Sequence, residues 1–158
     1  MLGVSGVRVV ARSTRYWDAL FQSRDYGRLV DLSSALCSGS VFRPQELQYG
    51  LPLPAFTFVE SLLWFAQAQR SGVWTYFEST PPERQAAMLQ TLESNPAPAG
   101  FAEHYALGMN NGKDVEKLDV VDLWIRAHDV DNNAWLWRIA DEHRALFEAL
   151  CAQEASVG

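Results

Sequence analysis

The chain has 158 residues, of which 48% are hydrophobic and 12% aromatic, and its formal net charge is −6. The length predicts a single domain, and the composition predicts a sizeable core and argues against disorder. The negative charge argues against direct binding of nucleic acid, which requires a basic surface. No run reaches the roughly 18 apolar residues that a membrane helix needs, so no membrane contact is expected.

Residues 1–12 show no helical pattern, and Val7 to Val10 form either a short strand or part of a loose N-terminal arm. Arg8 and Arg12 interrupt the apolar residues here, so the segment lacks the continuous apolar core of a signal peptide. The two cysteines lie far apart without a Cys-x-x-Cys spacing, as is usual in a reducing compartment. We therefore expect a cytoplasmic protein.

Two helices are predicted in the next part of the chain. Ser13 or Thr14 can cap a helix that runs through Phe21. A leucine pattern with helical spacing predicts a second helix over residues 26–36. Prolines and a glycine between residues 41 and 54 predict a loop.

The most informative segment covers residues 56–77. Its first part predicts a helix over about residues 55–69, in which Glu60, Ser61 and Gln67 form only a narrow polar stripe, so that most of the circumference should be buried. The apolar run breaks at a glycine and resumes as an aromatic cluster. We expect this motif to mark the centre of the fold; it consists of Gly72, Trp74, Tyr76 and Phe77.

Thr80, Pro81 and Glu83 have the spacing of a capping box, which predicts a helix from this point to about Ser94. Three further helices are predicted over about residues 101–109, 115–128 and 133–152, the second of them capped by Asp114. Trp135 and Trp137 cannot both face one core, so we expect one of them to be exposed. Together these patterns predict an all-α, single-domain bundle of about six or seven helices with short loops.

The sequence contains no motif of catalysis, phosphate binding or dinucleotide binding. Residues 129–140 begin like a calcium-binding loop, but Ala134 stands where a glycine is needed and Ala140 where a bidentate carboxylate is needed. The three histidines have no metal-binding spacing. We therefore predict no catalytic residue, no metal and no cofactor.

One acidic feature is a candidate binding surface. Four acids lie along one side of the helix predicted over residues 115–128 and just beyond it, interrupted by Arg126. These acids are Glu116, Asp119, Asp122 and Asp129. A docking surface for an Arg/Lys-rich protein is one interpretation, and a solvated face is the other.

The charge is also distributed unevenly along the chain. Residues 1–30 hold five arginines against two aspartates, whereas residues 101–158 hold eleven acids against five basic residues. If the basic N-terminus packs against the acidic C-terminal half, this asymmetry is internal and does not serve a partner.

Residues 58–77 resemble the central motif of a small bacterial family of unknown function that contains a DNA-mimic protein. Members typically show an apolar helix that ends in Asn-Gly-Gly, followed by an aromatic pair, where this chain has QRSGVWTYF at residues 69–77. The sequence LDVVD at residues 118–122 and the later Phe147 are similar to the family's C-terminal pattern. The resemblance extends over about residues 55–150, and it implies a helical, non-enzymatic protein that acts by binding another protein.

These observations predict a non-enzymatic acidic protein that binds and blocks a basic protein partner, as an immunity protein against a toxin or as a DNA mimic. A small metal-dependent or His/carboxylate enzyme of unknown substrate is the alternative. It would require four residues to converge in the fold: Glu103, His128, Asp129 and His143. A third interpretation is a self-associating module, such as a homodimer, which the aromatic excess favours.

Overall fold

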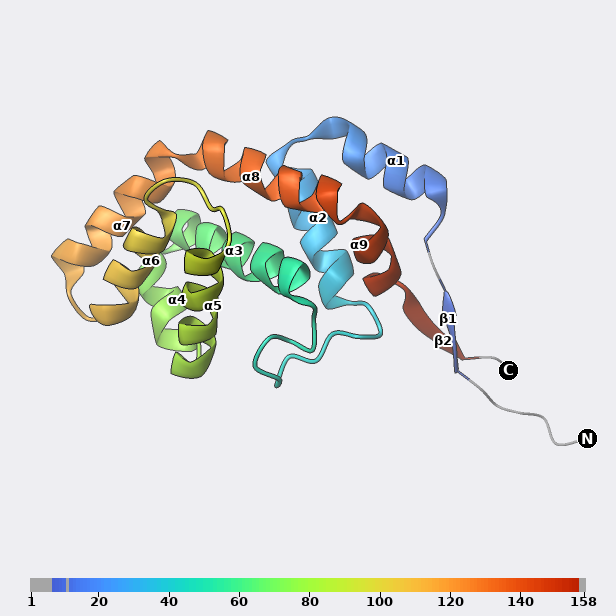
Figure 1. Ribbon diagram of the computed structural model, residues 1–158, viewed down its shortest axis with the longest axis horizontal. Helices are drawn as coiled ribbons and strands as arrows, with labels where there is room; N and C mark the ends of the chain where they lie inside the picture. The colour runs from blue at the N-terminus through green and yellow to red at the C-terminus, as the bar shows by residue number, and fades with distance from the viewer. Residues whose placement is uncertain (1–6, 11, 157–158) are drawn as a thin grey trace, which may run out of the picture.

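A computed structural model describes residues 7–10 and 12–156, and over these residues the chain forms nine α-helices and one pair of short strands (Figure 1). The fold is all-α, as predicted, although it has more helices than expected. In chain order the elements are β1 (Val7–Val10), α1 (Thr14–Ser23), α2 (Tyr26–Cys37), α3 (Leu53–Arg70), α4 (Val73–Ser79), α5 (Pro82–Ser94), α6 (Phe101–Asn110), α7 (Val115–Ala127), α8 (Asp129–Glu142), α9 (Arg144–Leu150) and β2 (Gln153–Ser156).

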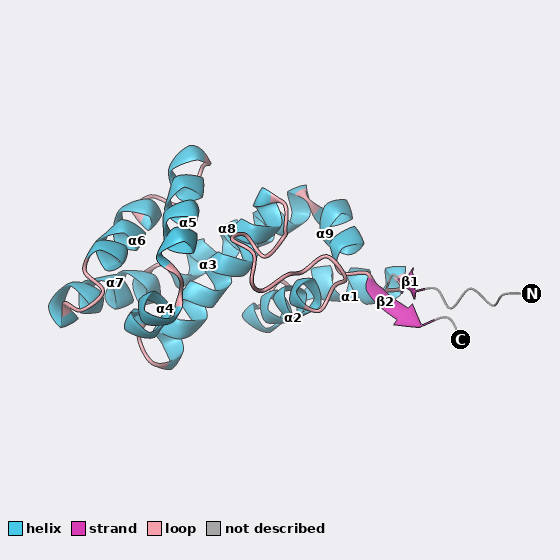
Figure 2. Ribbon diagram, turned by 90° about the horizontal axis from the view of Figure 1, so that it is seen from below, coloured by secondary structure: helices cyan, strands magenta, loops and turns pink. Residues whose placement is uncertain are grey.

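The helices form two groups at opposite ends of the molecule, and α3 and α8 connect them (Figures 1 and 2). One group contains α4 to α7, and the other contains α1, α2 and α9 next to the strand pair. Helix α3 contacts α2 on one side and α4, α5 and α7 on the other. A helix enclosed in this way has to be apolar around most of its circumference.

The burial of α3 follows this arrangement. Trp64 is completely buried, and its ring stacks on that of Phe101 with 5.1 Å between ring centroids. Of the three polar side chains that we expected to form a narrow stripe, Glu60 and Ser61 also lie in the core and are 0% exposed, whereas Gln67 is partly exposed. The exposed side of α3 includes Leu63 instead. The prediction that most of the helix is buried is therefore confirmed, whereas two of its predicted polar residues, Glu60 and Ser61, face inward.

Two of the predicted helix caps are confirmed. The Ser13 hydroxyl accepts a hydrogen bond from the Tyr16 N–H at the start of α1, with 3.2 Å between the atoms. The Asp114 carboxylate accepts one from the Lys117 N–H at the start of α7, at 3.3 Å. Both caps satisfy backbone donors that have no partner inside the helix.

The predicted capping box at Thr80 is wrong. Residues 73–79 form a helix of their own, α4, and Thr80 ends it by donating its N–H to the Tyr76 carbonyl at 2.9 Å. Helix α5 begins at Pro82 without a side-chain cap. The Thr80 carbonyl in turn accepts a hydrogen bond from the Gln85 side chain at 2.8 Å. Because the short helix α4 precedes it, Thr80 ends that helix and does not cap the start of α5.

The expectation that Trp135 or Trp137 is exposed is also wrong, since each is only 5% exposed. Trp135 packs on Phe101, with ring centroids 5.2 Å apart, and Trp137 packs on Phe21, at 5.7 Å. Both can be buried because α8 lies between the two helical groups, so that one of its sides packs on α6 and another packs on α1. The helix predicted over residues 133–152 is in fact α8 and α9, separated at His143.

The two ends of the described chain lie together. Strand β1 pairs antiparallel with β2, so that Val7 is opposite Ser156, and the remainder of the predicted N-terminal arm (residues 1–6 and 11) lies outside the described residues. Arg24 forms an ion pair with Asp141 at 2.6 Å. Among the described ion pairs, none joins an arginine of residues 12–28 to a carboxylate of α7. The acids of α7 are therefore not neutralised in that way.

No helix in the described part of the chain is both long and apolar enough to cross a lipid bilayer.

Candidate functional site

The four acids predicted to bind a partner do not share one environment. Glu116, Asp119 and Asp129 are exposed to solvent. Asp122 is only 8% exposed, because it points from α7 towards the start of α4. Three of the predicted residues are thus accessible to a partner, and the fourth is placed inside the fold.

Asp122 supplies the cap that α4 lacks. Its Oδ1 atom accepts a hydrogen bond from the Val73 N–H at 2.9 Å. The residue before α4, Gly72, has no side chain to cap the helix, and its φ of 100° lies in a region that favours glycine. Burial raises the pKa of Asp122, while the Val73 N–H and the charge of Arg126 act in the opposite direction. This contact joins α7 to Val73, the residue that follows the glycine of the sequence motif.

Replacing Asp122 with alanine is expected to destabilise the protein by about 1 kcal/mol, since an N-terminal helix cap of α4 is lost. Asp119→Ala removes an exposed carboxylate of the same helix and should change stability by less than about 0.5 kcal/mol. Urea denaturation followed by circular dichroism measures both variants. Equal losses in the two variants would show that Asp122 does not act as a cap.

Exposed apolar side chains gather beside these acids. Trp74 on α4 is 48% exposed, and Val115 and Leu123 on α7 are 69% and 61% exposed. Trp74 and Val115 line a hollow of about 460 Å³ together with Phe77 and Leu118. The indole N–H of Trp74 donates to the Ser71 carbonyl at 2.9 Å, which fixes the ring in this position.

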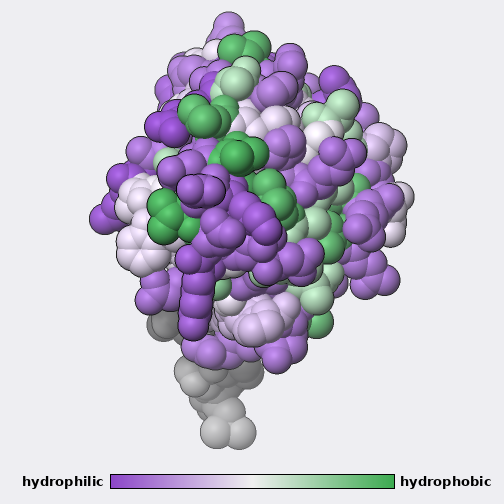
Figure 3. Space-filling view, turned by 90° about the vertical axis from the view of Figure 1, so that its left-hand side faces the viewer, coloured by the Kyte–Doolittle hydropathy of each residue, from purple (hydrophilic) through white to green (hydrophobic). Residues whose placement is uncertain are grey.

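We call this surface the α4–α7 face and define it by Trp74, Val115, Glu116, Asp119, Val120 and Leu123. Figure 3 views this end of the molecule and shows separate apolar side chains among hydrophilic ones. Residues 114–131 carry six carboxylates against Lys117 and Arg126. Lys117 is engaged with its own helix start, 4.0 Å from Asp114. The face therefore combines apolar side chains with a local excess of negative charge.

Two of the three histidines contact the same tryptophan. His104 and His128 each stack on the Trp124 ring, with centroid distances of 4.8 and 4.9 Å. Each ring uses Nδ1 to bond a backbone carbonyl, that of Gly100 at 2.7 Å for His104 and that of Trp124 at 2.8 Å for His128. These contacts are those of packed, hydrogen-bonded side chains.

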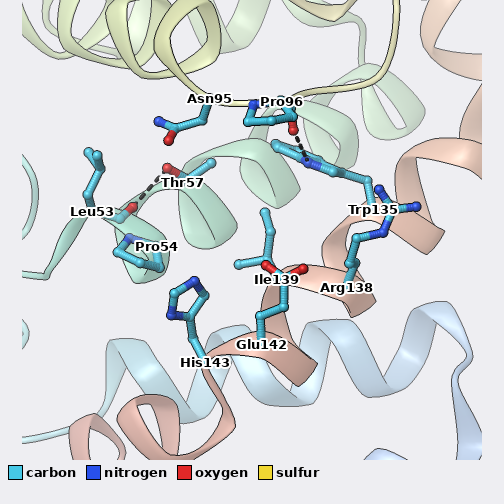
Figure 4. A pocket seen from close by; sticks show the side chains of 10 residues that line it. All are labelled: Leu53, Pro54, Thr57, Asn95, Pro96, Trp135, Arg138, Ile139, Glu142 and His143. Carbon is cyan, nitrogen blue, oxygen red and sulfur yellow. Dashed lines mark hydrogen bonds between the residues drawn. The ribbon is translucent and has the colours of Figure 1, made fainter.

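His143 lies instead in a groove of about 220 Å³ between the start of α3, the segment after α5 and the end of α8 (Figure 4). The imidazole points towards Pro54, and the Glu142 carboxylate lies beside Ile139. Within the described residues no group of three or more His, Cys, Asp or Glu side chains could hold a metal ion. The metal-dependent form of the enzyme alternative thus finds no assembled ligand set in this part of the chain.

The apolar residues of α7 are a feature of the sequence that indicates the α4–α7 face. Helix α7 has more apolar residues than one buried stripe requires. Leu118, Val121 and Ile125 fill the side that faces the core, so Val115 and Leu123 have to point elsewhere. A surplus of this kind on one helix indicates an exposed apolar surface.

No protein-family model, curated protein or solved structure matches this chain.

Proposed function

We propose that the protein is a non-enzymatic binding module that docks its α4–α7 face on a basic protein and blocks that partner's surface. The observation that carries the proposal is the combination, on one end of the molecule, of exposed Trp74 and Leu123 with the acids Glu116 and Asp119. Large exposed apolar side chains beside polar ones are typical of interaction surfaces.

Each part of the face has a physical role in this proposal. Tryptophan is enriched among the residues that contribute most binding energy, and Trp74 is already fixed by its bond to Ser71, so little side-chain entropy is lost on docking. Leu123 adds apolar area on the neighbouring helix. Glu116 and Asp119 would raise the association rate with a basic partner and set its orientation.

The amount of charge favours an immunity-type blocker over a mimic of a long DNA duplex. Helix α7 is about 20 Å long at about 1.5 Å per residue, and the same length of duplex carries about twelve phosphate charges. Residues 114–131 hold six carboxylates, of which Asp122 is buried, and two basic side chains. Charge alone therefore imitates only a short stretch of DNA, and apolar contacts have to supply the remaining affinity.

The test is capture of the partner from a lysate of the source cells, at low and at high salt, with wild type and variants as bait. We expect a basic protein that is captured by wild type, and we expect Leu123→Asp to weaken its binding at least about tenfold. Asp119→Lys should mainly slow association of the purified partner by several-fold. The control is Leu47→Ser, which removes an apolar side chain, 50% exposed, from a different surface.

Equal binding by wild type, Leu123→Asp and Leu47→Ser would remove the α4–α7 face from consideration. If the captured protein is a second copy of this chain, light scattering of the purified protein gives twice the monomer mass, and the self-association interpretation replaces the proposal.

A further inference from the structure

The core contains one carboxyl group with incomplete hydrogen bonding. Glu60 on α3 is 0% exposed, and its Oε2 atom accepts a hydrogen bond from the Tyr49 hydroxyl at 2.6 Å. Its Oε1 atom has no hydrogen-bond partner among the described residues. A buried polar atom without a partner costs free energy, and the cost is larger if the group is charged. The ionised form of Glu60 is thus poorly accommodated by the closed fold.

Titratable groups reach Glu60 from five parts of the structure: Cys37 of α2, Tyr49 of the loop, Tyr76 of α4, Arg84 of α5 and Tyr105 of α6. The Tyr76 and Tyr105 hydroxyls are hydrogen-bonded to one another at 2.6 Å. None of the described ion pairs involves Glu60, and the nearby cation, Arg84, is stacked on the Tyr49 ring at 4.2 Å from its centroid.

Burial raises the pKa of Glu60, while the hydrogen bond from Tyr49, the nearby Tyr76 hydroxyl and the charge of Arg84 partly oppose this change. Burial also raises the pKa values of the three tyrosines and of Cys37 above their ordinary values. Glu60 is therefore the member of this cluster that changes its charge at the lowest pH.

The segment of residues 41–52 is the only cover of Glu60 among these elements that is not helical. On its buried side, the Tyr49 hydroxyl of the segment is hydrogen-bonded to Glu60. On its exposed side, the Arg84 guanidinium donates to three carbonyls of the segment, those of Leu47, Pro44 and Glu46, at 2.9 to 3.1 Å. Tyr49 itself has a φ of 60°, which is unfavourable for a residue other than glycine. Moving this segment disrupts no helix and relieves a strained residue.

We propose that Glu60 and Tyr49 form a proton-controlled latch, in which protonated Glu60 keeps the 41–52 segment closed and loss of the proton releases it. The released segment lets water reach the carboxylate and satisfy both of its oxygens. Tyr49 and Leu51 belong to this segment and are buried in the closed state, so opening of the segment also exposes their apolar side chains. The latch makes this surface available as pH rises.

The direction of the pH dependence follows from the two states. The closed state holds its proton more tightly than the open state, in which the carboxyl has an ordinary pKa of about 4.3. Between these two pKa values the open population should therefore increase about tenfold per pH unit. Above the higher pKa it should become constant.

Amide hydrogen exchange by NMR, corrected for the intrinsic pH dependence of exchange, tests the latch. The probes are the amides of Arg43, which donates to the Tyr49 carbonyl at 2.7 Å, and of Leu51, which donates to Gln48 at 2.9 Å. We expect their protection factors to fall with rising pH in wild type and to be independent of pH in Glu60→Gln. The matched control Glu46→Gln removes a carboxylate from the segment itself and should keep the wild-type profile.

A pH-independent protection factor in wild type, or an unchanged slope in Glu60→Gln, would overturn the latch. If Glu60→Gln fails to fold, the titration of the Glu60 carboxyl group in Tyr49→Phe and in the wild-type protein tests the latch instead. Tyr49→Phe removes a donor that favours the charged form, so the carboxyl signal of Glu60 in a ¹³C-labelled sample should titrate at a higher pH than in wild type. In wild type that signal and the amide shifts of the segment should share one midpoint, and two different midpoints would contradict the proposal.

Discussion

Replacing Gly39 with alanine is expected to destabilise the protein by about 3 kcal/mol, and by more if the ends of the chain separate. A Cβ atom at this position would lie 1.9 Å from the carbonyl oxygen of Leu150 and 3.0 Å from its carbon. Both are backbone atoms, so no side chain can rotate away to make room. The neighbouring Ser40 N–H donates to the Ala152 carbonyl at 2.9 Å, which holds the two segments at this distance.

Gly27→Ala is the matched control, because Gly27 lies in α2 and its Cβ would meet only the Asp25 carboxylate, at 3.4 Å. Alanine is the better helix former, so this variant should be more stable than wild type by about 0.5 kcal/mol. Urea denaturation monitored by circular dichroism measures both changes. A Gly39→Ala variant within about 1 kcal/mol of wild type would show that the end of α2 and the end of α9 are not packed as closely as described.

Features of the fold that depend on neighbouring residues could be predicted from the sequence. The caps at Ser13 and Asp114 involve residues three positions apart, and the apolar run of α3 is read directly from residues 55–69. The all-α class follows from several such local patterns. A local pattern fails where two helices compete for one residue, as α4 and α5 do for Thr80.

Features that depend on distant partners could not be predicted. Glu60 lies in the core, where it accepts a hydrogen bond from Tyr49, eleven positions away in the 41–52 segment. Asp122 is turned inward because Val73, separated by 49 positions, has a free N–H at the start of α4. Helical spacing alone placed Asp122 with Glu116 and Asp119, since spacing shows which residues share a side of a helix but not what that side contacts.

The candidate site was therefore predicted only in part. Its acidic component was found from spacing, and its apolar component was not, because the aromatic motif was interpreted as core. Within that motif Tyr76 and Phe77 are buried, whereas Trp74 is the member left half-exposed. Adjacent residues of a helix point in different directions, so a motif of consecutive aromatic residues cannot serve one purpose throughout.

Trp64→Ala is expected to destabilise the protein by about 4 kcal/mol, the usual cost of removing a buried tryptophan. The Trp64 ring is 0% exposed and packs against Phe101 and Tyr105, with centroids 5.1 and 5.4 Å away. Such a loss is a large part of the 5–15 kcal/mol that stabilises a typical domain. Thermal unfolding measured by circular dichroism should show a much lower midpoint than wild type.

Trp74→Ala also removes a tryptophan side chain, ten positions later in the sequence. It should have little effect on stability and a large effect on partner binding. Trp74 is 48% exposed and keeps one hydrogen bond, to Ser71, so its loss should cost about 1 kcal/mol of stability. If the α4–α7 face binds a partner, this variant should still lose at least about tenfold in affinity. A folded Trp74→Ala protein with wild-type binding would contradict the proposed function, because an exposed ring that costs little to remove then has no role in the fold or in docking.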